Sequence, residues 1–328
     1  MVGWAGRCSG LCRLGTTVVV LLASATLPSY ATAQSGAKQI AVTFDDLPLN
    51  TAGVPASTLQ RVNAQILDVL TANHVPVIGF VNEVKLDGDG GRAARIQALE
   101  MWLDAGAELG NHAFSHPSLH HTPLDEFEDD VLRGAIVTNQ LLAVRGRARV
   151  SYFRHPFLRT GLTLEVKRAF EAFLEEEGYT VAPVTIENWD WMFNAVYVHA
   201  LDDRDTVLAD GVVEAYLQFT GETFDFHERV SREMFDRQIK HVFLVHTNEL
   251  NARYLSSIID LIRERDYEFV SLAHALEDEA YALPDDYAGP AGVSWMFRWD
   301  FSAGRKVDWR AEPEPPVFIQ RAYELALR

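Results

Sequence analysis

The 328-residue chain has little cysteine, no long apolar run beyond its first residues and few positive charges, and each shortage excludes a class of protein. Its two cysteines, Cys8 and Cys12, lie in the first 33 residues, so the chain beyond them has no disulfide and no cysteine ligand for a metal ion. Beyond residue 33 no stretch approaches the roughly 20 apolar residues of a membrane-spanning helix. With 48% hydrophobic residues, the chain is able to bury a large core instead.

The charge balance is strongly acidic. The chain has 29 Lys and Arg residues against 46 Asp and Glu residues, a net charge of −17. Residues 1–33 contain Arg7 and Arg13 and no acidic residue, so the rest of the chain has a net charge of −19. Such a field repels nucleic acid and anionic membrane surfaces, and it favours neutral or cationic partners. We therefore expect no nucleic-acid partner, while acidity that only maintains solubility explains the same charge equally well.

Residues 1–33 have the order of a secretory signal peptide. Two arginines precede an apolar run over 16–27, and Ala31-Thr32-Ala33 offers a small-residue cleavage site. We expect a mature chain that begins near Gln34, has no membrane span and is exported to the periplasm or secreted. A retained N-terminal anchor is the alternative.

From residue 38 onward the sequence repeats a short β-rich run, a turn and an amphipathic helical stretch. This repeat is typical of a parallel sheet wrapped by helices, and seven repeats predict one (β/α) barrel over 38–276 rather than two domains. The main predicted strands are 39–44, 75–81, 108–112, 150–153, 180–186 and 241–245. Long helices are expected over 124–144 and, with a break at 220–223, over 205–237.

Residues 277–328, the C-terminal extension, depart from this repeat. They contain five prolines and an aromatic cluster made of Trp295, Phe297, Trp299 and Phe301. We expect the extension to lie over the barrel. Its aromatic rings are candidates for stacking on sugar rings, although burial against the barrel is the commoner fate of such a cluster.

Two polar clusters fall at the carboxyl ends of predicted strands, the face on which barrel enzymes carry their active sites. Asp45 and Asp46 end the first strand, where the turning backbone lets both side chains address one pocket. His112 and His116 follow the third strand. Two imidazoles and one carboxylate are a common ligand set for a divalent metal ion, with positions left open for water and substrate. The second carboxylate would then be free to handle a proton.

The motifs around these residues resemble those of the polysaccharide deacetylases with a NodB homology domain, carbohydrate esterase family 4. Thr43-Phe44-Asp45-Asp46 is similar to the first motif of that family and His112-Ala113-Phe114-Ser115-His116-Pro117 to the second. The three remaining motifs have counterparts in Tyr152-Phe153-Arg154-His155-Pro156-Phe157, Asp190-Trp191 and Leu244-Val245-His246. All five occur in the family's order between residues 39 and 276, which chance does not explain.

The resemblance implies a deformed (β/α) barrel of the NodB type that holds one divalent metal ion, usually Zn²⁺. The implied metal ligands are Asp46, His112 and His116. Asp45 would be the general base, because a divalent cation lowers the pKa of its bound water and leaves a short proton transfer to a nearby carboxylate. His246 would be the general acid that protonates the leaving amine.

The resemblance also implies roles for the residues around this centre. Arg154 would orient and ionise Asp45, and Asp190 would accept a hydrogen bond from His246 and fix its ring. Two side chains would line the slot for the acetyl methyl group, and one backbone N–H would help to hold the tetrahedral oxyanion; these residues are Trp191, Leu244 and Phe157. The chain departs from the family pattern at Glu187, where many relatives carry an Asp, which puts the partner of the general acid in doubt.

These observations predict a metal-dependent hydrolase that removes N-acetyl, or O-acetyl, groups from an extracytoplasmic glycan. An amidase or deformylase acting on a small amide, and a glycan-binding protein without catalysis, are the alternatives. Iron(II) oxygenases share the ligand set, but they sit on double-stranded β-helix barrels rather than on alternating strands and helices. Peptidoglycan, chitin oligomers, xylan and exopolysaccharide all stay open as substrates, as do the physiological metal and the oligomeric state. The loops at 83–92 and 195–213 and the C-terminal extension are expected to select the substrate.

Overall fold

Eight parallel strands form one sheet in the computed structural model, which describes residues 10, 37–51, 53–87, 91–305 and 307–327. The strand order is β5-β4-β3-β2-β1-β7-β6, and β8 pairs with the first residues of β1. The strands are β1 (Lys38–Leu47), β2 (Val77–Val81), β3 (Glu108–Asn111), β4 (Tyr152–Phe153), β5 (Thr180–Val181), β6 (Ile186–Glu187), β7 (His241–His246) and β8 (Tyr267–Phe269). Apart from Gly10, the predicted signal peptide at residues 1–33 lies outside the described residues.

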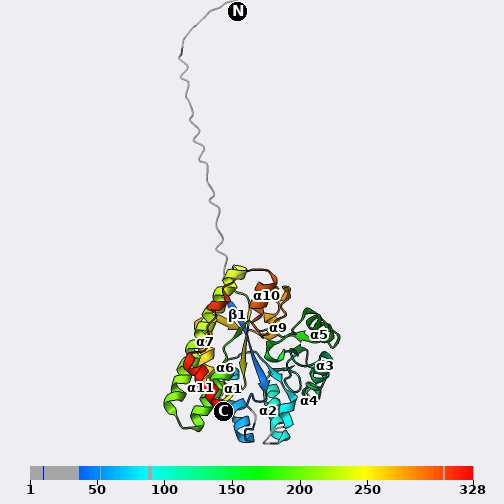
Figure 1. Ribbon diagram of the computed structural model, residues 1–328, viewed down its shortest axis with the longest axis vertical. Helices are drawn as coiled ribbons and strands as arrows, with labels where there is room; N and C mark the ends of the chain where they lie inside the picture. Colours follow the sequence, from blue (N-terminus) through cyan, green and yellow to red (C-terminus); the bar gives the residue numbers. More distant parts are fainter. Residues whose placement is uncertain (1–9, 11–36, 52, 88–90, 306, 328) are drawn as a thin grey trace, which may run out of the picture. The chain divides into compact units, whose positions relative to one another are not determined.

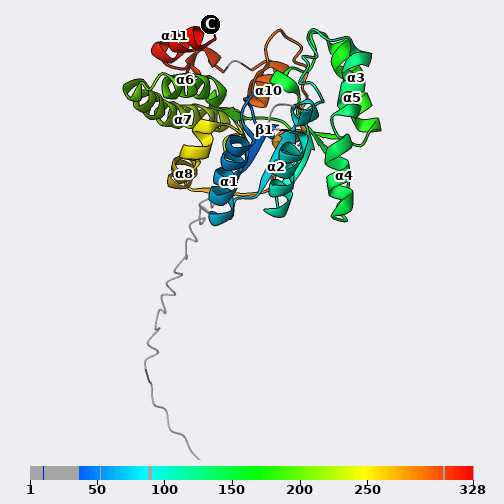
Figure 2. The same ribbon diagram turned by 90° about the horizontal axis from the view of Figure 1, so that it is seen from below.

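Helices follow most of the strands (Figure 1). The α-helices are α1 (Ala56–Ala72), α2 (Arg92–Asp104), α3 (Leu124–Arg133), α4 (Ile136–Val144), α5 (Leu164–Glu176), α6 (Asp190–Asp202), α7 (Thr206–Phe235), α8 (Glu249–Glu264), α9 (Leu272–Ala275), α10 (Trp295–Ser302) and α11 (Val317–Ala326). Short 3₁₀ turns are η1 (Glu83–Asp87), η2 (Pro156–Leu158), η3 (Glu279–Ala282) and η4 (Trp309–Ala311). Helix α1 packs between α2 and α8, and α6 packs against α7 and α11 (Figure 2). None of the described helices is long and apolar enough to cross a membrane.

Strand β1 sets the two faces of the sheet through the alternation of its side chains. Ile40, Val42 and Phe44 are fully buried in the main core, where the ring of Phe44 meets Trp102 edge-on with centroids 5.3 Å apart. Burial of one such side chain stabilises the fold by about 2 to 3 kcal/mol. The intervening residues Thr43 and Asp45 therefore point to the opposite face of the sheet.

The same alternation, combined with the register of the parallel strands, brings polar side chains together on that opposite face. Asp45 pairs in register with His246 of β7, and Thr43 pairs with Leu244. Leu244 in turn pairs with Glu187 of β6. Residues in register on neighbouring parallel strands point to the same face, so the ends of β1, β6 and β7 place these side chains in adjacent rows.

The prediction of a single helix over 124–144 is wrong. The structure has two helices there, α3 and α4, which are separated at Gly134. A Cβ atom at Gly134 would lie 2.6 Å from the carbonyl carbon of Ala113 and 2.7 Å from the amide nitrogen of Phe114. The helix is interrupted at the point where Gly134 packs against the loop that carries His112 and His116. Only glycine allows the two backbones to approach so closely.

Three other expectations also differ from the structure. The run 180–186 forms two short strands, β5 and β6, rather than one. Helix α7 is continuous through 220–223, since Thr220 Oγ1 donates to the carbonyl of Tyr216 at 2.8 Å and thus stays compatible with the helix. The segment 195–213, expected to be a substrate loop, belongs to α6 and to the start of α7.

The C-terminal extension attaches to the backbone between β5 and β6. The amide of Trp295 donates to the carbonyl of Val184 at 2.8 Å, and Ser294 Oγ donates to the carbonyl of Thr185 at 2.9 Å. Of its aromatic cluster, Trp295 and Trp299 are buried, whereas the side chain of Phe301 is exposed. Phe297 is half-buried, so two of the four rings are core and are not available as a platform for sugar rings.

Candidate active site

Asp46, His112 and His116 come together beyond the carboxyl ends of β1 and β3, with candidate ligand atoms that all lie within 4.8 Å of one another. The Oδ1 atom of Asp46 is 4.0 Å from His112 Nε2 and 3.7 Å from His116 Nε2. This Oδ1 atom is buried and accepts no hydrogen bond from the described residues, although Lys85 Nζ lies 2.9 Å from it as an ion pair. Two imidazole nitrogens and one carboxylate oxygen that face a common point fit a divalent cation such as Zn²⁺.

The hydrogen bonding of His112 suits it to ligate a metal ion. Its Nδ1 atom lies 2.7 Å from the carbonyl oxygen of Arg154, so Nδ1 carries the proton and Nε2 keeps a free lone pair. Burial holds the pKa of His112 well below 6.5, with His116 acting in the same direction. The ring is therefore neutral, which is the form that binds metals.

Left-handed backbone conformations turn these side chains toward one another. Asp46, Ala113 and His116 have φ angles of 70°, 62° and 58°. Such conformations are unfavourable for residues with a Cβ atom and persist only where the surrounding structure enforces them. Asn82 contributes to this enforcement, because its Nδ2 atom donates to the carbonyl of His112 at 2.6 Å.

The adjacent carboxylates, Asp45 and Asp46, have opposite electrostatic surroundings. Burial raises the pKa of Asp45 to about 6, although Arg154, whose Nη1 atom lies 3.4 Å from Asp45 Oδ2, acts against this. Burial also acts to raise the pKa of Asp46, but Lys85 and the nearby imidazoles outweigh it and hold that pKa below its usual range. Lys85 Nζ lies 2.9 Å from Asp46 Oδ1, and Asn50 Nδ2 donates to Asp46 Oδ2 at 2.7 Å. Asp46 is thus a permanent anion, whereas Asp45 exchanges a proton near neutral pH.

Arg154 links Asp45 to side chains of strands β1 and β2. Its side chain is fully buried, its Nη2 atom donates to Thr43 Oγ1 at 3.0 Å, and its guanidinium lies over the ring of Phe80 at 4.6 Å. Thr43 Oγ1 itself donates to the carbonyl of Phe243 at 3.0 Å. A fixed guanidinium next to Asp45 favours the carboxylate form and restricts its position.

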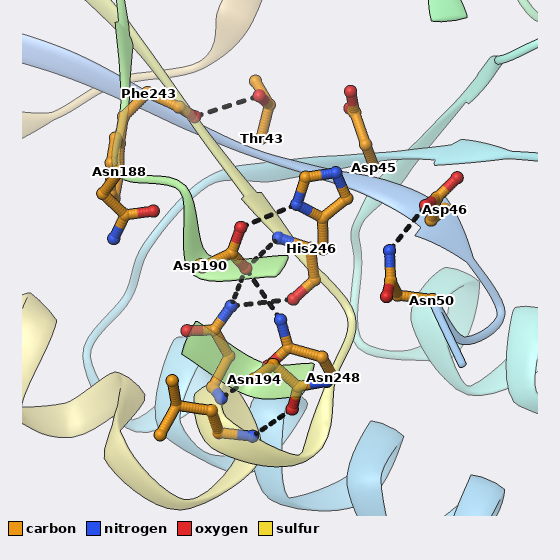
Figure 3. A network of polar contacts seen from close by, with 12 residues as sticks. Thr43, Asp45, Asp46, Asn50, Asn188, Asp190, Asn194, Phe243, His246 and Asn248 are labelled. Carbon is orange, nitrogen blue, oxygen red and sulfur yellow. Dashed lines mark hydrogen bonds and ion pairs between the residues drawn. The ribbon is translucent and has the colours of Figure 1, made fainter. Parts of the chain in front are cut away.

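His246 lies between Asp190 and Asp45 and pairs with Asp190 (Figure 3). Its Nδ1 atom lies 2.7 Å from Asp190 Oδ1. Burial lowers the pKa of His246, but the carboxylates of Asp190, Asp46 and Asp45 together outweigh burial, with Asp190 acting most strongly, and the pKa rises to about 9. His246 is therefore an imidazolium at neutral pH, with Nδ1–H directed to Asp190 and Nε2–H left to serve as an acid.

Asp190 is itself fixed by several donors (Figure 3). Its Oδ2 atom accepts hydrogen bonds from the amide of His246 at 2.8 Å, from Asn248 Nδ2 at 2.8 Å and from Asn251 Nδ2 at 2.6 Å. Glu187 is the residue that left the partner of His246 in doubt. Within the described part of the chain it makes no hydrogen bond or ion pair with His246. Burial and the nearby Glu312 raise its pKa to about 7.

The residues predicted to contact the acetyl group have different surroundings. The exposed ring of Phe157 meets the ring of His116 edge-on, with centroids 4.3 Å apart. Leu244 is buried in a small core with Leu158. Half-buried Trp191 stacks on Trp189 at 5.6 Å.

Four further residues of the site lie outside the predicted set: Lys85, Asn50, Asn248 and Asn251. Asn50 follows Asp46 by four residues, and the two other asparagines follow His246 by two and five residues, so their nearness to known motifs was a usable signal. Lys85 gave no such signal. It belongs to η1 after β2, a segment without any metal-ligand pattern.

Residues 32–179 match the family model described as polysaccharide deacetylase. The predicted resemblance to the polysaccharide deacetylases is confirmed. The chain is 30% identical over 118 residues to the chitin disaccharide deacetylase of Vibrio alginolyticus, a match that covers 35% of this chain and only 25% of that relative.

The solved structure of one polysaccharide deacetylase shows the fold. Bc1974 from Bacillus cereus aligns with a TM-score of 0.50 at 15% identity, over 71% of this chain and 91% of that chain. The peptidoglycan deacetylase PdaC from Bacillus subtilis aligns with a TM-score of 0.45 at 20% identity, over 74% of this chain and 92% of that chain. The chain therefore has the predicted deformed (β/α) barrel of the NodB type, with parallel strands and surrounding helices.

Proposed function

We propose that the protein is a metal-dependent deacetylase that removes N-acetyl groups from an amino-sugar glycan. The observation that carries this proposal is the placement of Asp45 and His246 in register on β1 and β7, next to the cluster of Asp46, His112 and His116. A carboxylate whose pKa lies near 6 and an imidazolium whose pKa lies near 9 form a base and an acid that coexist at neutral pH.

The proposed metal ligands are Asp46, His112 and His116. A divalent ion held there, most simply Zn²⁺, would supply an activated water and polarise the acetyl carbonyl. Asp45, positioned by Arg154, accepts the proton of the attacking water. These assignments follow from the neutral state of His112 and from the permanent negative charge of Asp46.

Cleavage of an amide requires a proton for the leaving nitrogen, because an unprotonated amine leaves poorly. His246 donates this proton from Nε2, and Asp190 keeps the opposite ring nitrogen protonated and the ring fixed. The backbone N–H of Phe157 donates to the oxyanion that develops on the carbonyl oxygen. Trp191 and Leu244 bound the slot for the acetyl methyl group.

We further propose an acetylated glycan outside the cytoplasm as the substrate, reached by export through residues 1–33. The predicted signal peptide, the acidic charge that favours a neutral polymer and the named activity of the Vibrio relative support this proposal. The proposed working unit is the barrel over 38–276 together with the C-terminal extension packed on it.

Acetate release by the purified protein tests the function. We would compare chitin oligomers, peptidoglycan fragments, acetylxylan and a small formyl amide, each with chelator, Zn²⁺ or Co²⁺, and use Asp45→Asn as the matched control. Metal-dependent acetate release from N-acetyl glycans by the wild type, and not by Asp45→Asn, is the expected result. Formate release alone would instead identify an amidase or deformylase, and glycan binding without release of either acid would identify a non-catalytic binding protein.

A further inference from the structure

The turn that follows β4 is conformationally unusual. Phe157 and Leu158 both have left-handed φ angles, of 57° and 53°. Two consecutive residues with side chains rarely adopt this conformation, and it persists only where neighbouring groups hold it. The turn matters to the site because the ring of Phe157 packs on His116.

The neighbouring groups that hold the turn belong to the C-terminal extension. A Cβ atom at Gly292 would overlap the carbonyl oxygen of Phe157 and would lie 2.9 Å from its carbonyl carbon and 3.2 Å from that of Leu158. The backbone of the extension thus rests directly on the Phe157–Leu158 peptide unit. Only a residue without a Cβ atom allows this approach.

Arg298 holds the same turn from a second direction. Its fully buried guanidinium donates from Nη1 to the carbonyl of Leu158 at 3.5 Å and from Nη2 to the hydroxyl of Thr160. Its Nε atom donates to Asp285 Oδ2 at 2.8 Å, and the same oxygen lies 2.6 Å from Lys167 Nζ of α5. The ion pair between Asp285 and Lys167 therefore joins the extension to α5. Hydrogen bonds from the buried guanidinium of Arg298 join the extension to the turn, and loss of the turn would leave N–H groups of that guanidinium without acceptors.

We propose that Gly292 and Arg298 are positioning residues that hold the Phe157–Leu158 turn, so that the amide and ring of Phe157 stay aligned with the reacting carbonyl and with His116. This inference rests on the proposed deacetylase function and adds that the C-terminal extension is a working part of the site. Loss of either contact releases the left-handed turn to commoner backbone conformations, which moves the Phe157 amide away. Catalysis then suffers while the metal ligands, which lie on β1 and the loop after β3, stay in place.

The test compares Gly292→Ala with Gly289→Ala in the full-length protein. The control lies in the same loop, but the atoms nearest to its added Cβ atom belong to the side chain of Tyr287 and not to the backbone of the turn. For Gly292→Ala we expect kcat for N-acetyl hydrolysis to fall at least about tenfold, with KM and the stoichiometry of bound Co²⁺ unchanged. Gly289→Ala should match the wild type in all three measurements.

Hydrogen exchange makes the test independent of activity. The backbone amides of the turn should exchange at least about tenfold faster in Gly292→Ala than in the wild type or in Gly289→Ala. If Gly292→Ala does not fold, Thr160→Val, which removes one acceptor of Arg298, gives the same comparison. Unchanged exchange in the turn, or faster exchange with an unchanged kcat, would overturn the inference. Absence of acetate release by the wild type would contradict the proposed function instead, and the exchange data would still report on the contact.

Discussion

Replacement of Asp190 by Asn should remove most of the pH dependence of stability above neutral pH in the metal-free protein. Asp190 is the carboxylate that keeps the buried side chain of His246 charged, through the 2.7 Å contact between Oδ1 and Nδ1. An asparagine has nearly the same shape but no charge. His246 would then lose the strongest of the negative charges that offset the burial of its imidazolium.

The size of the effect follows from the pKa of His246. Folding raises this pKa from 6.5 to about 9, which at about 1.4 kcal/mol per pKa unit corresponds to about 3 kcal/mol. Because the folded-state pKa is the higher one, this stability is fully present below pH 6.5 and is lost as the pH rises through about 9. The carboxyls with raised pKa values are buried Asp45, at about 6, and half-buried Glu187 and exposed Glu312, both at about 7. These groups titrate in both proteins, so His246 is followed through the difference between the wild type and Asp190→Asn.

Urea unfolding with chelator present, repeated between pH 6 and pH 10, measures the difference. The free energy of unfolding of the wild type, relative to Asp190→Asn, should decrease by about 3 kcal/mol across this range. A residual loss of about 1 to 3 kcal/mol should persist at high pH. The asparagine side chain has one acceptor oxygen, whereas the donors around Asp190 in the wild type bind two carboxylate oxygens. Asp203→Asn is the matched control, since it removes a carboxylate 3.5 Å from the exposed His199. An equal loss of stability with pH in the wild type and in Asp190→Asn would refute the reasoning.

Three further predictions concern the individual site residues. His112→Ala should lose the bound metal and the activity together while it keeps most of its fold, and full metal occupancy by elemental analysis would contradict the ligand assignment. Asp45→Asn should keep the metal ion but lower kcat by about a hundredfold or more in steady-state assays; metal loss in this variant would mean that the two carboxylates have exchanged roles. His246→Ala should keep the metal and lose far more activity on N-acetyl substrates than on O-acetyl esters with good leaving groups. Equal losses on both substrate types would give His246 another role.

The parts of the site that the sequence predicted are those that depend on spacing along single strands and turns. His112 and His116 lie four residues apart after β3, and Asp46 ends β1, so the carboxyl edge of a parallel sheet had to bring them near one another. His246 and Leu244 alternate with the core residues Phe243 and Val245, and this period of two predicts that they share a face.

The parts that the sequence did not predict depend on contacts between segments far apart in the chain. The division into α3 and α4 arises because Gly134 meets the loop of the second motif, and no helix propensity carries that information. The expected loop over 195–213 is wrong for its first half, which belongs to α6, although Phe193, Val196 and Ala200 repeat with helical spacing and are buried. Lys85 reaches Asp46 only because η1 follows β2 directly beside β1.

The adjacent pair Asp45 and Asp46 shows how two identical side chains acquire different chemistry from the backbone alone. Asp45 is still part of the regular alternation of β1, so it points to the face that carries Arg154 and His246. Asp46 follows with a φ angle of 70°, and this turn sends its carboxylate out of the row toward Lys85 and His116. Burial acts to raise both pKa values, but Lys85 and the imidazoles around Asp46 reverse the effect there, whereas Arg154 and His246 do not reverse it at Asp45. A fixed anion for metal binding and a titratable carboxylate for proton transfer thus arise from one change of backbone conformation between neighbours.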